Sequence, residues 1–162
     1  MVATRAVPRL RSRVDVRSEA FTANREAALA SLASLATLRV KANAGGGEKY
    51  VARHKKRGKL LPRERIELLL DRDAPFLEIG GLAGHDVKGE TTGTRVVGGV
   101  GVVSGTECLV VASEATVKGG AVTPMSLAKS SRLADIAEQN RLVGGSLIES
   151  AELMQHYERG EW

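Results

Sequence analysis

The sequence predicts an α/β fold with a partly parallel sheet, preceded by a helical segment. Leucines recur at roughly helical spacing within residues 18–42. Later in the chain two β-branched runs, a helical pattern and a further apolar run follow one another. Strand, helix, strand is the order of a β-α-β unit, in which the two strands lie parallel. Because aromatic residues make up only 3% of the 162 residues, the core must come from aliphatic side chains.

The front of the chain, residues 18–74, predicts three helices. Ser18 suits the N-cap of the first, which lasts until a Gly-Gly-Gly triplet interrupts the chain. A second helix over residues 48–57 ends before Gly58, a residue type that favours the position after a helix. Pro62 fits the start of the third helix.

The rest of the chain differs in amino-acid composition, because glycine and β-branched residues become frequent. The predicted order is a short strand at 76–79, a loop at 80–93, a hairpin of 96–103 and 107–112, a helix at 126–140 and a buried strand from 146 to 149. Gly98 and Gly99 inside the hairpin predict a bulge or a closely approaching backbone.

Positive charge is concentrated at the front of the chain. Residues 1–65 hold 16 Lys and Arg against 5 Asp and Glu, whereas the whole chain has a net charge of +5. Such a segment could contact nucleic acid, a membrane surface or a phosphorylated small molecule, or form a solvated helix face. Scarce aromatics and the lack of a nucleic-acid-binding motif argue against nucleic acid. No apolar run approaches the roughly 20 residues of a membrane-spanning helix.

The sequence gives weak support for a catalytic role of any polar residue. His54 lies in a basic helix without a visible partner, and the adjacent side chains of His85 and Asp86 are expected to point apart. Cys108, the single cysteine, excludes an internal disulfide and reads as a small buried hydrophobe. No spacing resembles a metal site.

Two features favour a binding site for an anion. Gly119 and Gly120 form a loop with Lys118, and backbone N–H groups in such a loop can bind an oxyanion or a phosphate. The basic cluster from Arg53 to Arg65 could hold a phosphate or pyrophosphate. A solvent-exposed helix face without a ligand explains that cluster equally well.

Several runs occur together in one order. They are GGGEK at 45–49, RGKLLPRERI at 57–66, PFLE at 75–78, ATVKGGA at 115–121, IAEQNRL at 136–142 and SLIES at 146–150. In this order and spacing they resemble the carboxyltransferase β subunit of biotin-dependent acyl-CoA carboxylases. That family includes the propionyl-, acetyl- and methylcrotonyl-CoA carboxylase β chains. The resemblance covers residues 18–150.

The resemblance implies a crotonase-like (ClpP/crotonase) carboxyltransferase N domain, present here in incomplete form. It implies transfer of a carboxyl group from carboxybiotin to an acyl-CoA, with biotin on a partner α subunit that carries the biotin carboxylase and carrier functions. It also implies a homo-oligomeric, hexameric core, no metal, and no covalently bound cofactor. CoA would bind near Lys118, Gly119, Gly120 and Ala121.

One departure from the family concerns the oxyanion hole. In the family the strand ending in Glu-Ser continues into Gly-Gly-Ala, and that Gly-Gly pair stabilises a developing oxyanion. Here Ala151 and Glu152 follow, and Gly144-Gly145 replaces an apolar pair earlier in the strand. We therefore expect a truncated chain with no catalytic residue of its own and negligible activity alone. The alternative is a non-catalytic module that binds CoA or associates with other subunits.

The expected organisation has four parts. They are a disordered basic tail at 1–17, the helical segment at 18–74, the start of the carboxyltransferase N domain at 75–150 and a divergent tail at 151–162. The Arg-rich start is one feature of a mitochondrial transit peptide, but its serine content is low. The expected location is the cytoplasm, with the mitochondrial matrix as the alternative.

Overall fold

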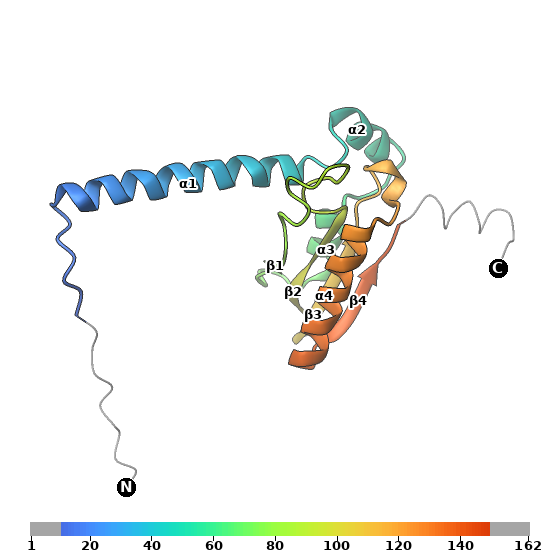
Figure 1. Ribbon diagram of the computed structural model, residues 1–162. Coiled ribbons are helices and arrows are strands. Elements are labelled where there is room, and N and C mark those ends of the chain that lie inside the picture. The colour runs from blue at the N-terminus through green and yellow to red at the C-terminus, as the bar shows by residue number, and fades with distance from the viewer. Residues whose placement is uncertain (1–10, 150–162) are drawn as a thin grey trace, which may run out of the picture. The chain divides into compact units, whose positions relative to one another are not determined.

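A computed structural model describes residues 11–149 of the chain (Figure 1). The expected site positions Ala151 and Glu152, and the rest of the divergent tail, lie outside the described residues. The chain divides into two compact units, Met1–Ala36 and Thr37–Trp162. The sheet and the cavities described below all belong to the second unit.

Three helices form the front of the chain, as the sequence predicts. Helix α1 spans Glu19–Asn43, α2 spans Glu48–Lys56 and α3 spans Pro62–Leu69. The hydroxyl of Ser18 accepts a hydrogen bond from the backbone N–H of Phe21 at 3.2 Å, which confirms the predicted N-cap. Gly58 adopts a φ of 72°, a conformation that glycine allows at little cost just after a helix.

A mixed sheet of four strands forms the centre of the second unit. The strands are β1 (Leu77–Glu78), β2 (Val96–Val103), β3 (Thr106–Ser113) and β4 (Val143–Leu147), in the order β1-β2-β3-β4. β1 and β2, and β2 and β3, are antiparallel, whereas β3 and β4 are parallel. The connection from β3 to β4 contains the 3₁₀ turn η1 (Lys118–Gly120) and helix α4 (Pro124–Asn140). The predicted β-α-β unit is therefore confirmed.

The last strand differs from its prediction in position and burial. β4 begins at Val143, rather than at Ser146, and includes Gly144 and Gly145. Pairing with β3 uses only backbone groups, so glycines that lack a strand-like side-chain pattern still join the sheet. β4 is also partly exposed along its length rather than buried.

Helices cover both faces of the sheet. On one face, Ile66 of α3 forms the core with Val97, Val110 and Ala112. On the other, Leu133 of α4 is 1% exposed and lies where a side chain on Gly98 would otherwise be. Thr123 caps α4, because its hydroxyl accepts from the backbone N–H of Ser126 at 3.1 Å.

The glycines of β2 permit close approach rather than a bulge. Each residue of β2 opposes one residue of β3 without interruption, so no extra residue is inserted. A Cβ on Gly99 would fall against the carbonyl oxygen of Leu77 in β1. Gly99 therefore lets β1 join the sheet. Within residues 11–149, no helix is both long and apolar enough to cross a membrane.

Candidate functional site

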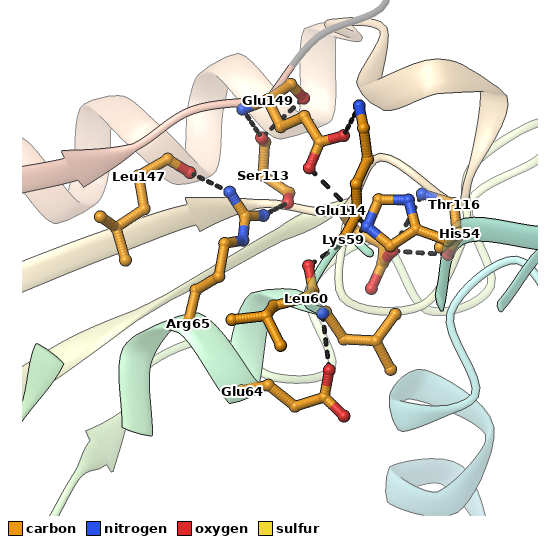
Figure 2. A network of polar contacts seen from close by, with 11 residues as sticks. His54, Lys59, Leu60, Glu64, Arg65, Ser113, Glu114, Thr116, Leu147 and Glu149 are labelled. Carbon is orange, nitrogen blue, oxygen red and sulfur yellow. Dashed lines mark hydrogen bonds and ion pairs between the residues drawn. The ribbon is translucent and has the colours of Figure 1, made fainter. Parts of the chain in front are cut away.

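The carboxyl ends of β3 and β4 meet at one edge of the sheet, because these two strands are parallel. Open α/β sheets commonly bind ligands at this edge. Arg65 of α3 joins the two strand ends, since its guanidinium donates to the carbonyl oxygens of Ser113 (2.5 Å) and Leu147 (2.9 Å). Figure 2 shows this arginine between the two strands. Arg65 is half-buried, and these two hydrogen bonds hold the strand ends together.

Glu149, just after β4, connects the same edge to the end of α2. Its carboxylate lies 2.6 Å from the ammonium of Lys59 and 3.7 Å from His54 Nε2 (Figure 2). His54 Nε2 also donates to the carbonyl oxygen of Leu60 at 3.1 Å. The expectation that His54 has no partner is therefore wrong. Its partners come from the turn after α2 and from the far end of the chain, which a local pattern does not reveal.

The loop after β3 is fixed by buried polar groups. Thr116 donates from both its N–H (3.0 Å) and its hydroxyl (2.5 Å) to the carboxylate of Glu114. The backbone N–H of Gly46 donates to the same hydroxyl at 2.9 Å. Glu114 and Thr116 are both buried, so these bonds are protected from water. They hold the following turn, where Lys118 has a left-handed φ of 47°.

A basic cavity of about 260 Å³ lies between α2 and this turn. Its lining includes the cations Arg53, Arg57, Lys59 and Lys118, together with Gly119. Lys59 is paired with Glu149. The other three cations have no ion pair with any residue of the described part. The basic cluster and the glycine loop, separate in the sequence, thus meet at one place, which suits a phosphorylated ligand.

The glycine turn separates this cavity from a second one. Gly120 and Ala121 line an apolar groove of about 810 Å³ between α4 and the strands β3 and β4. Of the four residues that the resemblance assigns to CoA, two therefore line the basic cavity and two line the groove. Arg95, which precedes β2, also borders the groove, and sequence reasoning did not single it out.

The loop at 80–93 borders a third, polar cavity of about 480 Å³. His85 Nε2 lies 3.2 Å from a carboxylate oxygen of Asp86, so the expectation that these side chains point apart is wrong. The left-handed φ of 62° at Asp86 changes the direction of the chain and brings the two together. Cys108 is half-buried at the margin of the core. Among residues 11–149, no group of three or more His, Cys, Asp or Glu could hold a metal ion.

A buried lysine in α4 is also absent from the residues predicted from the sequence. Lys129 is 8% exposed and donates to the carbonyl oxygens of Gly93 (3.2 Å) and Val96 (2.5 Å). Burial lowers the pKa of Lys129 to about 8, because the low-dielectric surroundings disfavour its charge. Its position four residues before the core residue Leu133, on the same face of α4, is the one signal that could have found it.

Comparison with known proteins matches this arrangement to one family. The family described as "Carboxyl transferase domain" matches residues 53–155. A probable mitochondrial methylcrotonoyl-CoA carboxylase beta chain of Drosophila melanogaster is 46% identical over 143 residues, covering 87% of this chain and 25% of that protein. A probable biotin-dependent acyl-coenzyme A carboxylase beta2 subunit of Mycobacterium tuberculosis is 53% identical over 110 residues, covering 68% of this chain and 21% of that protein.

Solved structures agree. The beta subunit of geranyl-CoA carboxylase from P. aeruginosa superposes with a TM-score of 0.81 at 42% identity, covering 89% of this chain and 27% of that one. The chain thus spans about a quarter of the length of the relatives that it matches. These likenesses confirm the crotonase-like carboxyltransferase fold that the sequence motifs predict.

Proposed function

The chain belongs to the carboxyl transferase domain family, and from this we propose that it forms the CoA-binding part of an acyl-CoA carboxylase β subunit. In such a subunit a carboxyl group passes from carboxybiotin to an acyl-CoA. The observation that carries the proposal is the meeting of α2 and the Lys118 turn at the carboxyl edge of β3 and β4.

The basic cavity matches the charge of CoA. CoA carries a 3′-phosphate and a diphosphate, and guanidinium groups bind phosphate oxygens through two parallel hydrogen bonds. Arg53 and Arg57 supply such groups from one side, and Lys118 adds a point charge from the other. Gly119 has no Cβ, so a phosphate can approach its backbone closely. We assign the phosphates of CoA to this cavity and the Lys118–Ala121 turn to the path towards the thioester.

The chemical step needs donors for two oxygens that become negative, on the thioester enolate and on the ureido group of biotin. Carboxybiotin, on a partner chain, would supply the carboxyl group. No described residue is assigned to biotin, and the family's Gly-Gly position falls at Ala151 and Glu152, outside the described residues. We therefore assign binding of CoA, and no step of the transfer, to residues 11–149.

The whole protein's partners are part of the same proposal. They are an α subunit that carries biotin carboxylase and biotin carrier functions, and further copies of the β subunit in a hexameric core. The proposed location is the cytoplasm. The mitochondrial matrix is the alternative, and the Drosophila relative is named as mitochondrial.

A second candidate function, association with other subunits without catalysis, is favoured by α1. None of its residues is buried, and Leu29, Leu32 and Leu35 are exposed on it. An exposed row of leucines on one helix is typical of a surface that another chain covers. Sedimentation of the purified chain tests this candidate, because Leu32→Gln should dissociate an assembly that this row holds together.

Calorimetric titration of the chain with CoA tests the binding proposal. Lys118→Gln and Arg57→Gln should each weaken binding by about tenfold, because each removes one charged contact to a phosphate. Arg132→Gln, at an exposed position on α4, is the matched control and should leave the affinity unchanged. CoA that binds equally well to all four proteins, or to none of them, contradicts the assignment.

The same preparation tests the expectation on activity. Transfer of a carboxyl group from free carboxybiotin to an acyl-CoA should be negligible with the 162-residue chain alone, even where CoA binds. Robust turnover would show that the chain carries its own oxyanion donors, and the expectation drawn from Ala151 and Glu152 would be wrong.

A further inference from the structure

The apolar groove exists because β4 presents only Gly144 and Ser146 on this face of the sheet, where larger side chains would fill the space. Helix α4 packs on β2 and β3, with Leu133 against Gly98. Near the last turn of α4, a Cβ on Gly144, which pairs with the groove residue Leu109, would meet no atom within 4 Å. The space that side chains of β4 would fill is therefore left open between α4 and the sheet.

The groove is long and mostly apolar. Leu109 and Val111 form its floor, and Leu127 and Ile148 line it while staying largely exposed. Its lining follows α4 from Ser126 to Ala137, which at about 1.5 Å per residue corresponds to roughly 16 Å. Apolar surface of this extent is costly to leave in water and typical of a binding site.

A buried, unpaired cation lies at one end of the groove. Arg95 is 6% exposed, and its Nη1 donates to the carbonyl oxygen of Ala121 at 3.2 Å. Its Nε has no hydrogen-bond partner, and no carboxylate of residues 11–149 forms an ion pair with it. A buried charge without a counter-charge is costly. Arg95 also borders the polar cavity near His85, but the hydrogen bond that its side chain makes within residues 11–149 is to Ala121, which lines the groove.

The two ends of the groove therefore differ in chemistry. Arg95 and Ser113 lie at the carboxyl edge of β3, near the first turn of α4. Ala137 and Gly144 lie at the other end, near the last turn of α4. We propose that the groove binds a medium-chain fatty acid, with its carboxylate on the Arg95 guanidinium and its alkyl chain along α4 towards Gly144.

This site is separate from the basic cavity. The two share no lining residue, although the glycine turn lies between them. A fatty acid suits the groove in both charge and shape. Its carboxylate compensates the charge of Arg95, and its alkyl chain covers the leucine and valine side chains. The site does not depend on CoA binding, so either proposal can fail without the other.

Titration of the 162-residue chain with decanoate, below its micellar concentration, tests the proposal, with decan-1-ol as the uncharged comparison. The wild type should bind decanoate saturably and at least about tenfold more tightly than decan-1-ol, because the alcohol leaves Arg95 without a counter-charge. Arg95→Gln should remove this preference, while Arg132→Gln, on the exposed side of α4, should keep it. Equal binding of the two ligands to the wild type would overturn the proposal.

Gly144→Val is a second variant that keeps the test valid if Arg95→Gln does not fold. The valine side chain enters open space, so the strand should tolerate it. It fills the tail end of the groove, and decanoate affinity should fall at least about tenfold. Unchanged affinity in folded Gly144→Val would overturn the proposal. A wild-type dimer that Gly144→Val dissociates, with no decanoate binding, would instead assign the groove to a second copy of the chain.

Discussion

The pH dependence of stability should reveal the buried ammonium of Lys129. Burial lowers its pKa to about 8 in the folded chain, from a usual value of 10.5. Glu78 opposes this shift by stabilising the charge, but burial dominates. Between these two pH values the unfolded chain therefore holds a proton that the folded chain has lost.

The sign and size of the effect follow from this difference. Stability rises with pH wherever the unfolded state binds more protons, so the penalty for burying Lys129 is relieved between about pH 8 and 10.5. Below pH 8 both states are protonated, and Lys129 contributes no slope. Because one pKa unit corresponds to about 1.4 kcal/mol, the gain from pH 7 to pH 10 should be about 2 to 3 kcal/mol.

Urea unfolding of the wild type and of Lys129→Met at both pH values measures the effect. Methionine keeps most of the apolar stem but cannot titrate, so the difference in free energy of unfolding cancels the other titrating groups. This difference should move in favour of the wild type by the amount above. Lys88→Met, at an exposed loop position, should show no such change. A difference that stays the same at pH 7 and pH 10 would refute the reasoning.

Two further substitutions, Gly99→Ala and Arg65→Met, test the sheet, with Gly144→Ala as a control. Gly99→Ala should lower the free energy of unfolding by about 1 to 3 kcal/mol, because its methyl group would press against the Leu77 carbonyl. Gly144→Ala, whose methyl group meets open space, should not, and denaturant titration compares the two. Arg65→Met should cost about 2 to 4 kcal/mol, because two strand-end carbonyls lose their donor. It should also speed hydrogen exchange in β4, and unchanged protection there would contradict the role given to Arg65.

Local patterns were sufficient to predict the order of the elements. Ser104 and Gly105 between two β-branched runs predicted the β2–β3 hairpin, and both residues have positive φ in the turn. The helix before β4 was predicted from its spacing of apolar residues. The parallel pairing of β3 and β4 followed from that order.

Contacts between distant residues could not be predicted in the same way. His54 meets Glu149, and Arg65 meets the ends of two strands, only after the sheet has formed. The burial of Arg95 has no signal in the sequence either, because it depends on where Ala121 and α4 lie. The division of the glycine turn between two cavities is likewise a property of the packed structure, although the turn itself was recognisable from its residues.

The network in Figure 2 has a consequence for how the chain folds while it is being synthesised. Lys59 and Arg65 leave the ribosome well before their partners are made. Lys59 binds Glu149, and Arg65 binds the carbonyl oxygen of Leu147. During synthesis the helices α2 and α3 therefore lack these contacts until β4 and Glu149 have been made. A nascent chain paused before β4 would carry these helices without their final anchoring, and would present them to chaperones and proteases at that stage.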